Sequence, residues 1–180
     1  MRWISHALVG CFFIFAAAAP RSALAEQSAA LKKFFGEFEG VGITSRKRPG
    51  RASLKRRDLD VVIKPYGKDG FTMTWTTVIA PRYAQKRRER TTTVNFMATT
   101  RTEVWRSDPV TTLHTRRPVI WARIGGGALY VYLATMTEAG GIATSVYKRT
   151  LTKQGMRLEF NRTTDGRSVR TVQARLKRKK

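Results

Sequence analysis

The chain has 180 residues, with 35 Lys and Arg against 12 Asp and Glu, so its formal net charge is +23 at pH 7. Self-repulsion of this size opposes a compact state, and we therefore expect an anionic partner. The single cysteine excludes a disulfide within the chain, so the fold must depend on burial and backbone pairing.

Residues 1–25 have the three regions of a secretory signal peptide. Arg2 supplies a positive start, an apolar run covers 8–19, and 23–25 (ALA) places small residues where signal peptidase cleaves. The apolar run is short for a membrane span, and Pro20 interrupts it. The sequence therefore predicts export, a periplasmic location and cleavage after Ala25.

Cleavage would leave 155 of the 180 residues, enough for one domain with a core. The cysteine and one of the two histidines would leave with the signal, so a usual zinc site is excluded. No set of catalytic residues can be assembled from those that remain. We predict no enzyme activity, no metal and no cofactor, with a domain over 26–176 and a disordered basic tail over 177–180 (KRKK).

Alternation of apolar and polar residues dominates the rest of the chain and is typical of half-buried strands. It is clearest at 71–76 (FTMTWT) and 156–161 (MRLEFN), and segments with turn residues, such as 65–70 and 125–127, lie between such patterns. We predict a short helix over 26–36. The predicted strands cover 37–45, 58–64, 70–79, 90–98, 100–107, 118–124, 128–136, 142–151, 156–163 and 168–176.

The order of these segments determines the fold class. No long helical pattern separates the strands, which excludes a parallel sheet with crossover helices. Short connections predict an antiparallel meander, and closure of the meander removes exposed strand edges. The predicted fold is all-β: a single antiparallel up-and-down barrel of about ten strands after a short helix.

In such a barrel, successive connections alternate between the two ends. The first, third and fifth connections, predicted at 46–57, 80–89 and 108–117, are the longest and are basic. The sequence therefore predicts a basic rim around one mouth, where the planar guanidinium of arginine suits phosphate or carboxylate. The rim residues are Arg46, Arg48, Arg56, Arg57, Arg87, Arg88, Arg116 and Arg117.

Aromatic residues form a second group of candidate binding residues. Trp75 shares a strand face with other large apolar residues, and this face fits either a solid core or a ligand cavity. We include Trp75 and Tyr132 in the predicted ligand site. Aromatics that alternate with cations also occur in proteins that bind single-stranded nucleic acid, but an exported protein has no evident route to that partner.

The segment 34–42 (FFGEFEGVG) and the meander after it resemble the calycin group, which includes lipocalins and fatty-acid-binding proteins. The segment is similar to the short helix, glycine and aromatic that open such barrels, with Phe38 where lipocalins have tryptophan. Members usually carry small hydrophobic ligands inside the barrel, and ten strands would resemble the fatty-acid-binding arrangement. The chain also resembles uncharacterised exported proteins of Gram-negative bacteria, a likeness that adds no function.

Two functions remain open at this point. The first is a non-catalytic periplasmic protein that binds an anionic lipid, fatty acid or lipid head group in its barrel, with peripheral contact to a membrane. The second is a solid-cored adaptor that docks on lipopolysaccharide, peptidoglycan or an acidic protein. A cavity in the barrel favours the first, and a filled interior favours the second.

Overall fold

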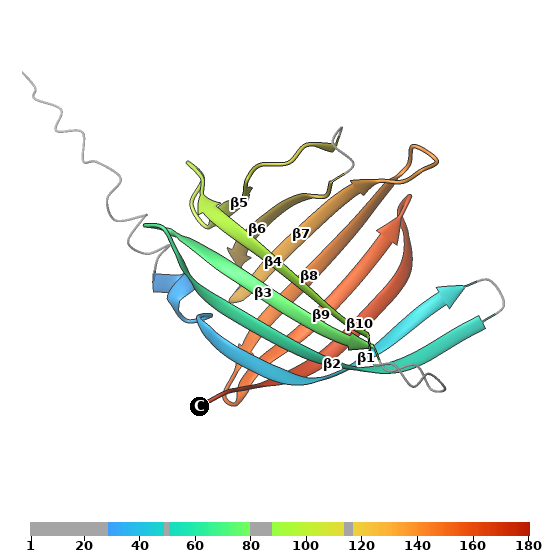
Figure 1. The fold of residues 1–180 in the computed structure, drawn as a ribbon, viewed down its shortest axis with the longest axis horizontal. Helices are drawn as coiled ribbons and strands as arrows, with labels where there is room; N and C mark the ends of the chain where they lie inside the picture. Colours follow the sequence, from blue (N-terminus) through green and yellow to red (C-terminus); the bar gives the residue numbers. More distant parts are fainter. Residues whose placement is uncertain (1–28, 49–50, 80–87, 114–116) are drawn as a thin grey trace, which may run out of the picture.

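The computed structural model describes residues 29–48, 51–79, 88–113 and 117–180. Within these residues, a short helix at 29–32 precedes ten antiparallel strands that close into one barrel in the order β1-β10-β9-β8-β7-β6-β5-β4-β3-β2 (Figure 1). The strands are β1 (Gly36–Arg48), β2 (Arg51–Tyr66), β3 (Gly70–Ile79), β4 (Arg88–Ala98), β5 (Val104–Asp108), β6 (Val119–Gly125), β7 (Ala128–Met136), β8 (Ile142–Thr152), β9 (Gly155–Thr164) and β10 (Arg167–Arg178). The predicted all-β, ten-stranded up-and-down barrel is confirmed.

Period-two alternation places the apolar residues of each strand inside the barrel. In β3, Phe71 and Met73 are fully buried, while the alternate residue Thr74 bonds Thr93 of β4 through their hydroxyls at 2.9 Å on the exposed side. Tight turns close the hairpins: Asp165 and Gly166 both have positive φ between β9 and β10, a conformation that Asp tolerates and Gly adopts freely. The local pattern and the turn chemistry therefore agree with the closed sheet.

The barrel has two ends, which differ in their connections. The packed end carries the helix and the connections β2–β3, β4–β5, β6–β7 and β8–β9. The open end carries the connections β1–β2, β3–β4, β5–β6, β7–β8 and β9–β10, as the antiparallel order requires. The strand ends that flank the first, third and fifth connections therefore lie at the same end of the barrel, as the meander predicts, and the basic rim itself stays a prediction.

A dense apolar core fills the packed end. Phe71 stacks on Phe96 at 4.6 Å between ring centroids and meets Trp105 edge-on at 5.7 Å, and all three are fully buried. Leu31 and Phe34, from the helical segment, are buried against the same cluster and cover this end of the barrel. Burial of this aromatic surface accounts for much of the stability expected of the fold.

The chain beyond residue 176 belongs to this end, which corrects the prediction of a disordered tail over 177–180. Lys177 and Arg178 are the last residues of β10 and pair with β1, and the amide of Lys179 donates to the carbonyl of Glu37 at 2.8 Å. The guanidinium of Arg178 lies 4.6 Å from the centre of the Phe38 ring and donates to the carbonyl of Lys33. Backbone pairing thus outweighs the charge run.

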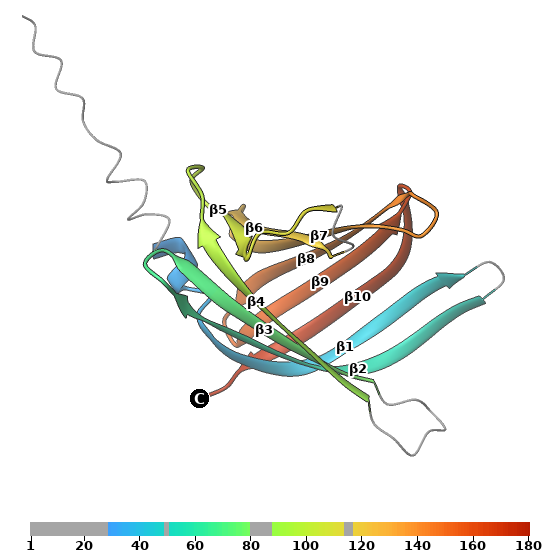
Figure 2. The same cartoon turned by 45° about the horizontal axis from the view of Figure 1, so that its top comes forward.

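The first connection is much shorter than predicted. The sequence suggests a loop over 46–57, but β1 and β2 stay in register from Gly36↔Ile63 to Arg48↔Arg51. Hydrogen bonds between neighbouring strands form from backbone groups whatever the charge of the side chains. A run of cations therefore removes the apolar alternation that predicts a strand without preventing the strand from forming. The pairing of β1 with β10 ends at Arg46↔Arg170, and the pairing of β2 with β3 begins only at Asp58↔Val78. The end of β1 and the start of β2 therefore extend past their neighbours as a ribbon that projects from the open end (Figures 1 and 2).

One part of the barrel wall is thin. The five-residue strand β5 pairs with β4 only over Asn95–Ala98 and with β6 only over 121–123. The first half of β4, from residue 88 to 94, therefore has no described partner strand on its β5 side. No helix among the described residues has the length and hydropathy needed to cross a bilayer.

Candidate ligand-binding site

A cavity of about 380 Å³ lies inside the barrel at the open end. The lining residues combine aliphatic and aromatic side chains with three arginines, and no Asp or Glu belongs to the lining in the described part of the chain. The apolar lining consists of Leu59, Trp75, Pro118, Ile120, Leu133, Tyr147, Leu158, Phe160 and Val172, and the cationic lining of Arg90, Arg162 and Arg170. Such a cavity suits a molecule with an apolar body and an anionic group.

Three aromatic rings meet inside the barrel from different walls. Tyr147 of β8 lies 4.6 Å from Phe160 of β9 and 5.8 Å from Trp75 of β3, measured between ring centroids, and all three line the cavity. The rings are tilted against one another rather than stacked, at 45° and 49°. Their faces and edges give the cavity a rigid apolar wall.

Two of the lining arginines occupy directly paired positions. Arg162 of β9 and Arg170 of β10 are Cα partners, and Arg46 of β1 follows as the partner of Arg170. A register shift between Ser168 and Arg170 marks a bulge, a device that commonly re-aims a side chain beside a site. Like charges directly opposite one another repel, and a bound anion would relieve that repulsion.

A fourth arginine, Arg149, is buried behind the aromatic wall. Its side chain is 1% exposed, and its Nε and Nη1 atoms have no hydrogen-bond partner among the described residues. The guanidinium carbon lies 5.2 Å from the centre of the Tyr147 ring. Desolvation lowers the pKa of Arg149 to about 10, against a smaller raising effect of Tyr147, so the group stays protonated at pH 7. A buried cation without an anion is unfavourable for the folded state.

The hydroxyl of Tyr147 lies in a strongly cationic environment. Burial raises its pKa, while Arg149, Arg170, Arg90 and Arg162 each lower it to a smaller extent. Tyr147 therefore stays neutral at pH 7 and can donate a hydrogen bond to an anion. The influence of all four guanidinium groups on one hydroxyl indicates that their positive potential converges on the cavity.

The sparsely paired wall between β4 and β6 borders this cavity. Arg90 and Thr92 line the cavity from the part of β4 that has no described partner on the β5 side. Pro118, just before β6, and Ile120 of β6 line it from the other side of that part of the wall. The cavity therefore lies where the described strands of the barrel have the fewest pairings.

The structure brings only some of the sequence-predicted site residues to the cavity. Trp75 lines it, and its predicted role in ligand binding stays a prediction. Tyr132 does not, because its β7 neighbours Val131 and Leu133 point inward and alternation turns Tyr132 outward. On the outer face it stacks on Trp121 at 5.1 Å and accepts a hydrogen bond from Arg123 Nε at 3.2 Å.

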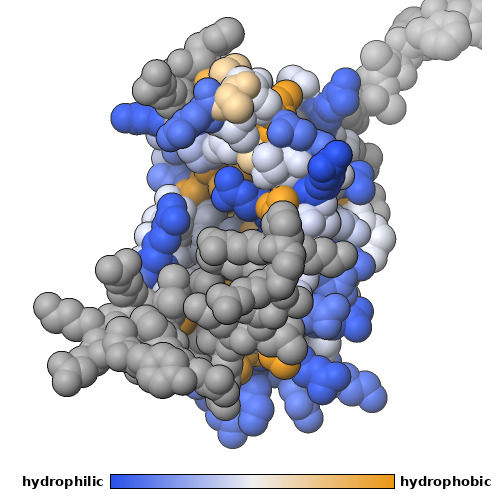
Figure 3. Space-filling view, turned by 90° about the vertical axis from the view of Figure 1, so that its right-hand side faces the viewer, coloured by the Kyte–Doolittle hydropathy of each residue, from blue (hydrophilic) through white to orange (hydrophobic). Residues whose placement is uncertain are grey.

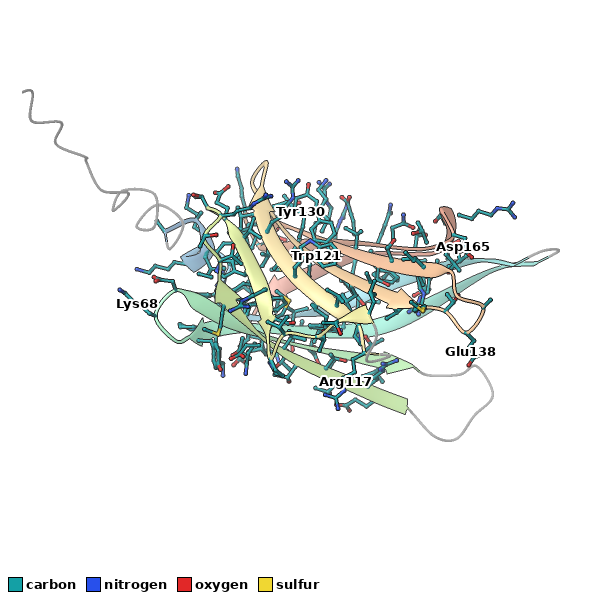
Figure 4. The ribbon with its side chains drawn as sticks, turned by 90° about the horizontal axis from the view of Figure 1, so that it is seen from above. Lys68, Arg117, Trp121, Tyr130, Glu138 and Asp165 are labelled. Carbon is teal, nitrogen blue, oxygen red and sulfur yellow. The ribbon has the colours of Figure 1, made fainter. Side chains whose placement is uncertain are left out.

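The predicted rim arginines are spread over strands and connections. Arg46 and Arg48 belong to β1, Arg56 and Arg57 to β2, and Arg88 is the first residue of β4, so these five lie in strands and not in loops. Arg117 is exposed beside the cavity residue Pro118 but does not line the cavity, and it lies well apart from Trp121 and Tyr130 in Figure 4. Arg87 and Arg116 lie outside the described residues.

The sequence analysis missed Arg90, Arg149, Arg162 and Arg170. A signal for three of them is present, because each lies two residues from an inward apolar residue in a strand: Arg149 from Tyr147, Arg162 from Phe160 and Arg170 from Val172. A cation at an inward position of an alternating strand is unusual enough to mark an interior site.

Comparisons with known proteins identify the fold but not a family. No family model matches the sequence, and no curated protein matches it either. The barrel is similar to the crystal structure of a protein of unknown function from the DUF3598 family of Nostoc punctiforme, with a TM-score of 0.52 and 12% sequence identity. The match covers 83% of this chain and 49% of that protein, so the chain spans about half of its length. The architecture is consistent with a calycin-like barrel.

Proposed function

We propose that this protein is a non-catalytic, exported binding protein that holds a small anionic amphiphile inside its barrel. The observation that carries the proposal is the cavity itself: an aromatic and aliphatic lining combined with Arg90, Arg162 and Arg170. The periplasm is the proposed location, on the basis of the signal-like segment 1–25.

The chemistry of the lining suggests how such a ligand would lie. A hydrocarbon or aromatic body would contact Trp75, Tyr147 and Phe160, and a carboxylate or phosphate would accept hydrogen bonds from Arg162 and Arg170. The volume of about 380 Å³ lies at the lower end of the range of small-molecule sites, which favours a short chain or a single ring system.

The buried Arg149 supports an anionic ligand over a neutral one. A protonated guanidinium whose Nε and Nη1 atoms have no hydrogen-bond partner among the described residues raises the free energy of the empty barrel. Negative charge in the cavity, which the neighbouring Tyr147 lines, would offset part of that penalty. The cavity also favours this function over a solid-cored adaptor, which has no use for internal space.

The test is a titration of the delipidated protein with matched ligands. We expect decanoate or decyl phosphate to bind with micromolar affinity, and decanol, with the same chain and no charge, to bind at least tenfold more weakly by calorimetry. Equal binding of decanol, or absence of binding by all three, would contradict the proposal. Native mass spectrometry of protein purified from its own periplasm would identify the natural ligand class.

A further inference from the structure

The β1–β2 ribbon at the open end concentrates positive charge. Over residues 46–57 seven of twelve residues are Lys or Arg and none is acidic. Residues 51–57 of β2 lie beyond its pairing with β3, and residues 47–48 of β1 lie beyond its pairing with β10, so this hairpin extends past the closed sheet at the open end. An isolated ribbon of two strands is only marginally stable in water, which makes an external partner for this one plausible on physical grounds.

A second feature of the same end is an exposed apolar pair. Met136 and Ile142 are Cα partners at the end of the β7–β8 hairpin and are 52% and 50% exposed. The amide of Thr137 donates to the carbonyl of Gly141 at 2.8 Å, and the amide of Ile142 donates to Asp165 Oδ1 at 3.0 Å. These hydrogen bonds fix the β7–β8 hairpin against the β9–β10 turn. The exposed side chains of Met136 and Ile142 therefore belong to an ordered turn.

The ribbon, the apolar pair and the cavity all belong to the open end, because the connections β1–β2, β7–β8 and β9–β10 lie on the same side of an antiparallel barrel (Figure 1). Figure 3 views this end and shows hydrophobic and hydrophilic residues interspersed. Cations together with exposed apolar side chains are the combination that binds an interface of anionic lipid head groups and acyl chains.

We propose that the open end docks on an anionic phospholipid bilayer, with the ribbon against the head groups and the Met136–Ile142 pair inserted at the acyl boundary. Docking would place the cavity next to the membrane from which an amphiphile is taken; this use rests on the proposed function, whereas docking itself does not. Among the described residues, the acidic residues of this end are fewer than the seven ribbon cations: Asp58 at the base of the ribbon, Glu89 near the start of β4, Glu138 at the hairpin and Asp165 at the turn. A soluble polyanion such as nucleic acid would use the cations but would leave the apolar pair exposed.

The test measures sedimentation of the full chain with vesicles of phosphatidylglycerol and phosphatidylcholine, and with vesicles of phosphatidylcholine alone. We expect Arg48→Gln, Arg51→Gln, Arg56→Gln and Arg57→Gln together to reduce partitioning to the anionic vesicles about a hundredfold at low salt. The matched control neutralises four cations of the packed end, Lys32, Lys33, Lys68 and Lys153, and should reduce it less than threefold.

The apolar pair is tested separately. We expect Met136→Ser with Ile142→Ser to reduce partitioning roughly tenfold, including at high salt, where the contribution of the ribbon is screened. Met97→Ser, at a methionine that is 43% exposed on β4, is the control and should leave partitioning unchanged. Circular dichroism and melting would confirm that each variant is folded.

Three results would overturn the proposal: equal losses in the ribbon variant and the packed-end control, unchanged partitioning of the apolar variant, or binding to duplex DNA as tight as to anionic vesicles. Arg170→Gln keeps this test distinct from that of the proposed function. Arg170→Gln should weaken decanoate binding and leave vesicle partitioning unchanged. The Met136→Ser, Ile142→Ser variant should partition less to vesicles and bind decanoate in solution as the wild type does.

Discussion

The packed end and the open end of the barrel are built from the same ten strands, but their interiors differ. At the packed end, inward positions carry Phe71, Phe96 and Trp105, which fill the space completely. At the open end, inward positions carry arginine beside aromatic residues and leave a cavity. One closed sheet therefore stabilises the fold through the apolar core at one end and holds, at the other end, a cationic site that is unfavourable for folding.

Two tryptophans give the sharpest test of this difference. We expect Trp105→Ala, at a fully buried position whose Nε1 donates to the carbonyl of Asp69 at 2.9 Å, to lower the free energy of unfolding by about 3–5 kcal/mol. Trp75→Ala, beside the cavity, should lower it by only about 1–2 kcal/mol and weaken decanoate binding. Urea denaturation measures the free energy of unfolding of both variants, and Trp105→Phe serves as a milder variant. Equal losses of stability in Trp105→Ala and Trp75→Ala would contradict the difference between the two ends.

Arg149 should show opposite effects on stability and on binding. We expect Arg149→Met to raise the free energy of unfolding of the empty protein by about 2–3 kcal/mol, because an apolar side chain of similar length replaces a desolvated charge. The same change should weaken decanoate binding relative to wild type. A destabilised variant would instead assign Arg149 a structural role, and thermal melts with and without decanoate separate the two cases.

Arg170 should affect binding with little effect on folding. We expect Arg170→Gln to weaken decanoate binding by about 2 kcal/mol, the size of a charge-assisted hydrogen bond, and to leave the melting temperature within a few degrees. The control is Arg175→Gln, an exposed position of the same strand outside the cavity lining. Equal affinities of the two variants in calorimetry would place the anion elsewhere.

The smallest expected effect is the pH dependence of Tyr147. Because burial raises the folded pKa of Tyr147 above its ordinary value of 10.0, the native state keeps a proton that the unfolded chain loses. The stability contributed by the neutral hydroxyl is therefore complete below pH 10 and is lost as the pH rises through the folded pKa. We expect Tyr147→Phe to reduce the loss of stability between pH 9 and pH 11 by about 1 kcal/mol, measured by urea titration at each pH.

The sign of this effect distinguishes it from that of Arg149. The pKa of Arg149 is lowered on folding, so its contribution to stability rises with pH above about 10. Tyr147→Phe also removes the raising effect of Tyr147 on the pKa of Arg149, so the contribution of Arg149 to stability rises at least as early with pH in the variant, and both changes reduce the loss. A steeper loss of stability in Tyr147→Phe than in wild type would contradict the assignment.

The sequence predicted the fold well because strand alternation and turn residues are local signals. The ten predicted strands agree in number and order with the structure, and most bounds differ by only a few residues. The main errors lie in segments that are rich in cations. Residues 46–48 and 51–57 belong to strands instead of a loop, and Lys177 and Arg178 complete β10 instead of starting a tail. Backbone hydrogen bonds to neighbouring strands decide both cases, and no local window contains those partners.

The candidate site was predicted only in part, since alternation within one strand does not say which strands meet across a barrel. Trp75, on a plainly apolar strand face, lines the cavity, whereas Tyr132, the other aromatic residue of the predicted ligand site, lies outside the lining on β7. The sequence by itself determined the class of fold, the meander and the high positive charge. Only the tertiary structure decided that Arg162 pairs with Arg170, that Arg149 lies behind Tyr147, and that one end of the barrel is hollow. Closure of the sheet brings together residues far apart in the chain, and register between strands determines which of them face each other.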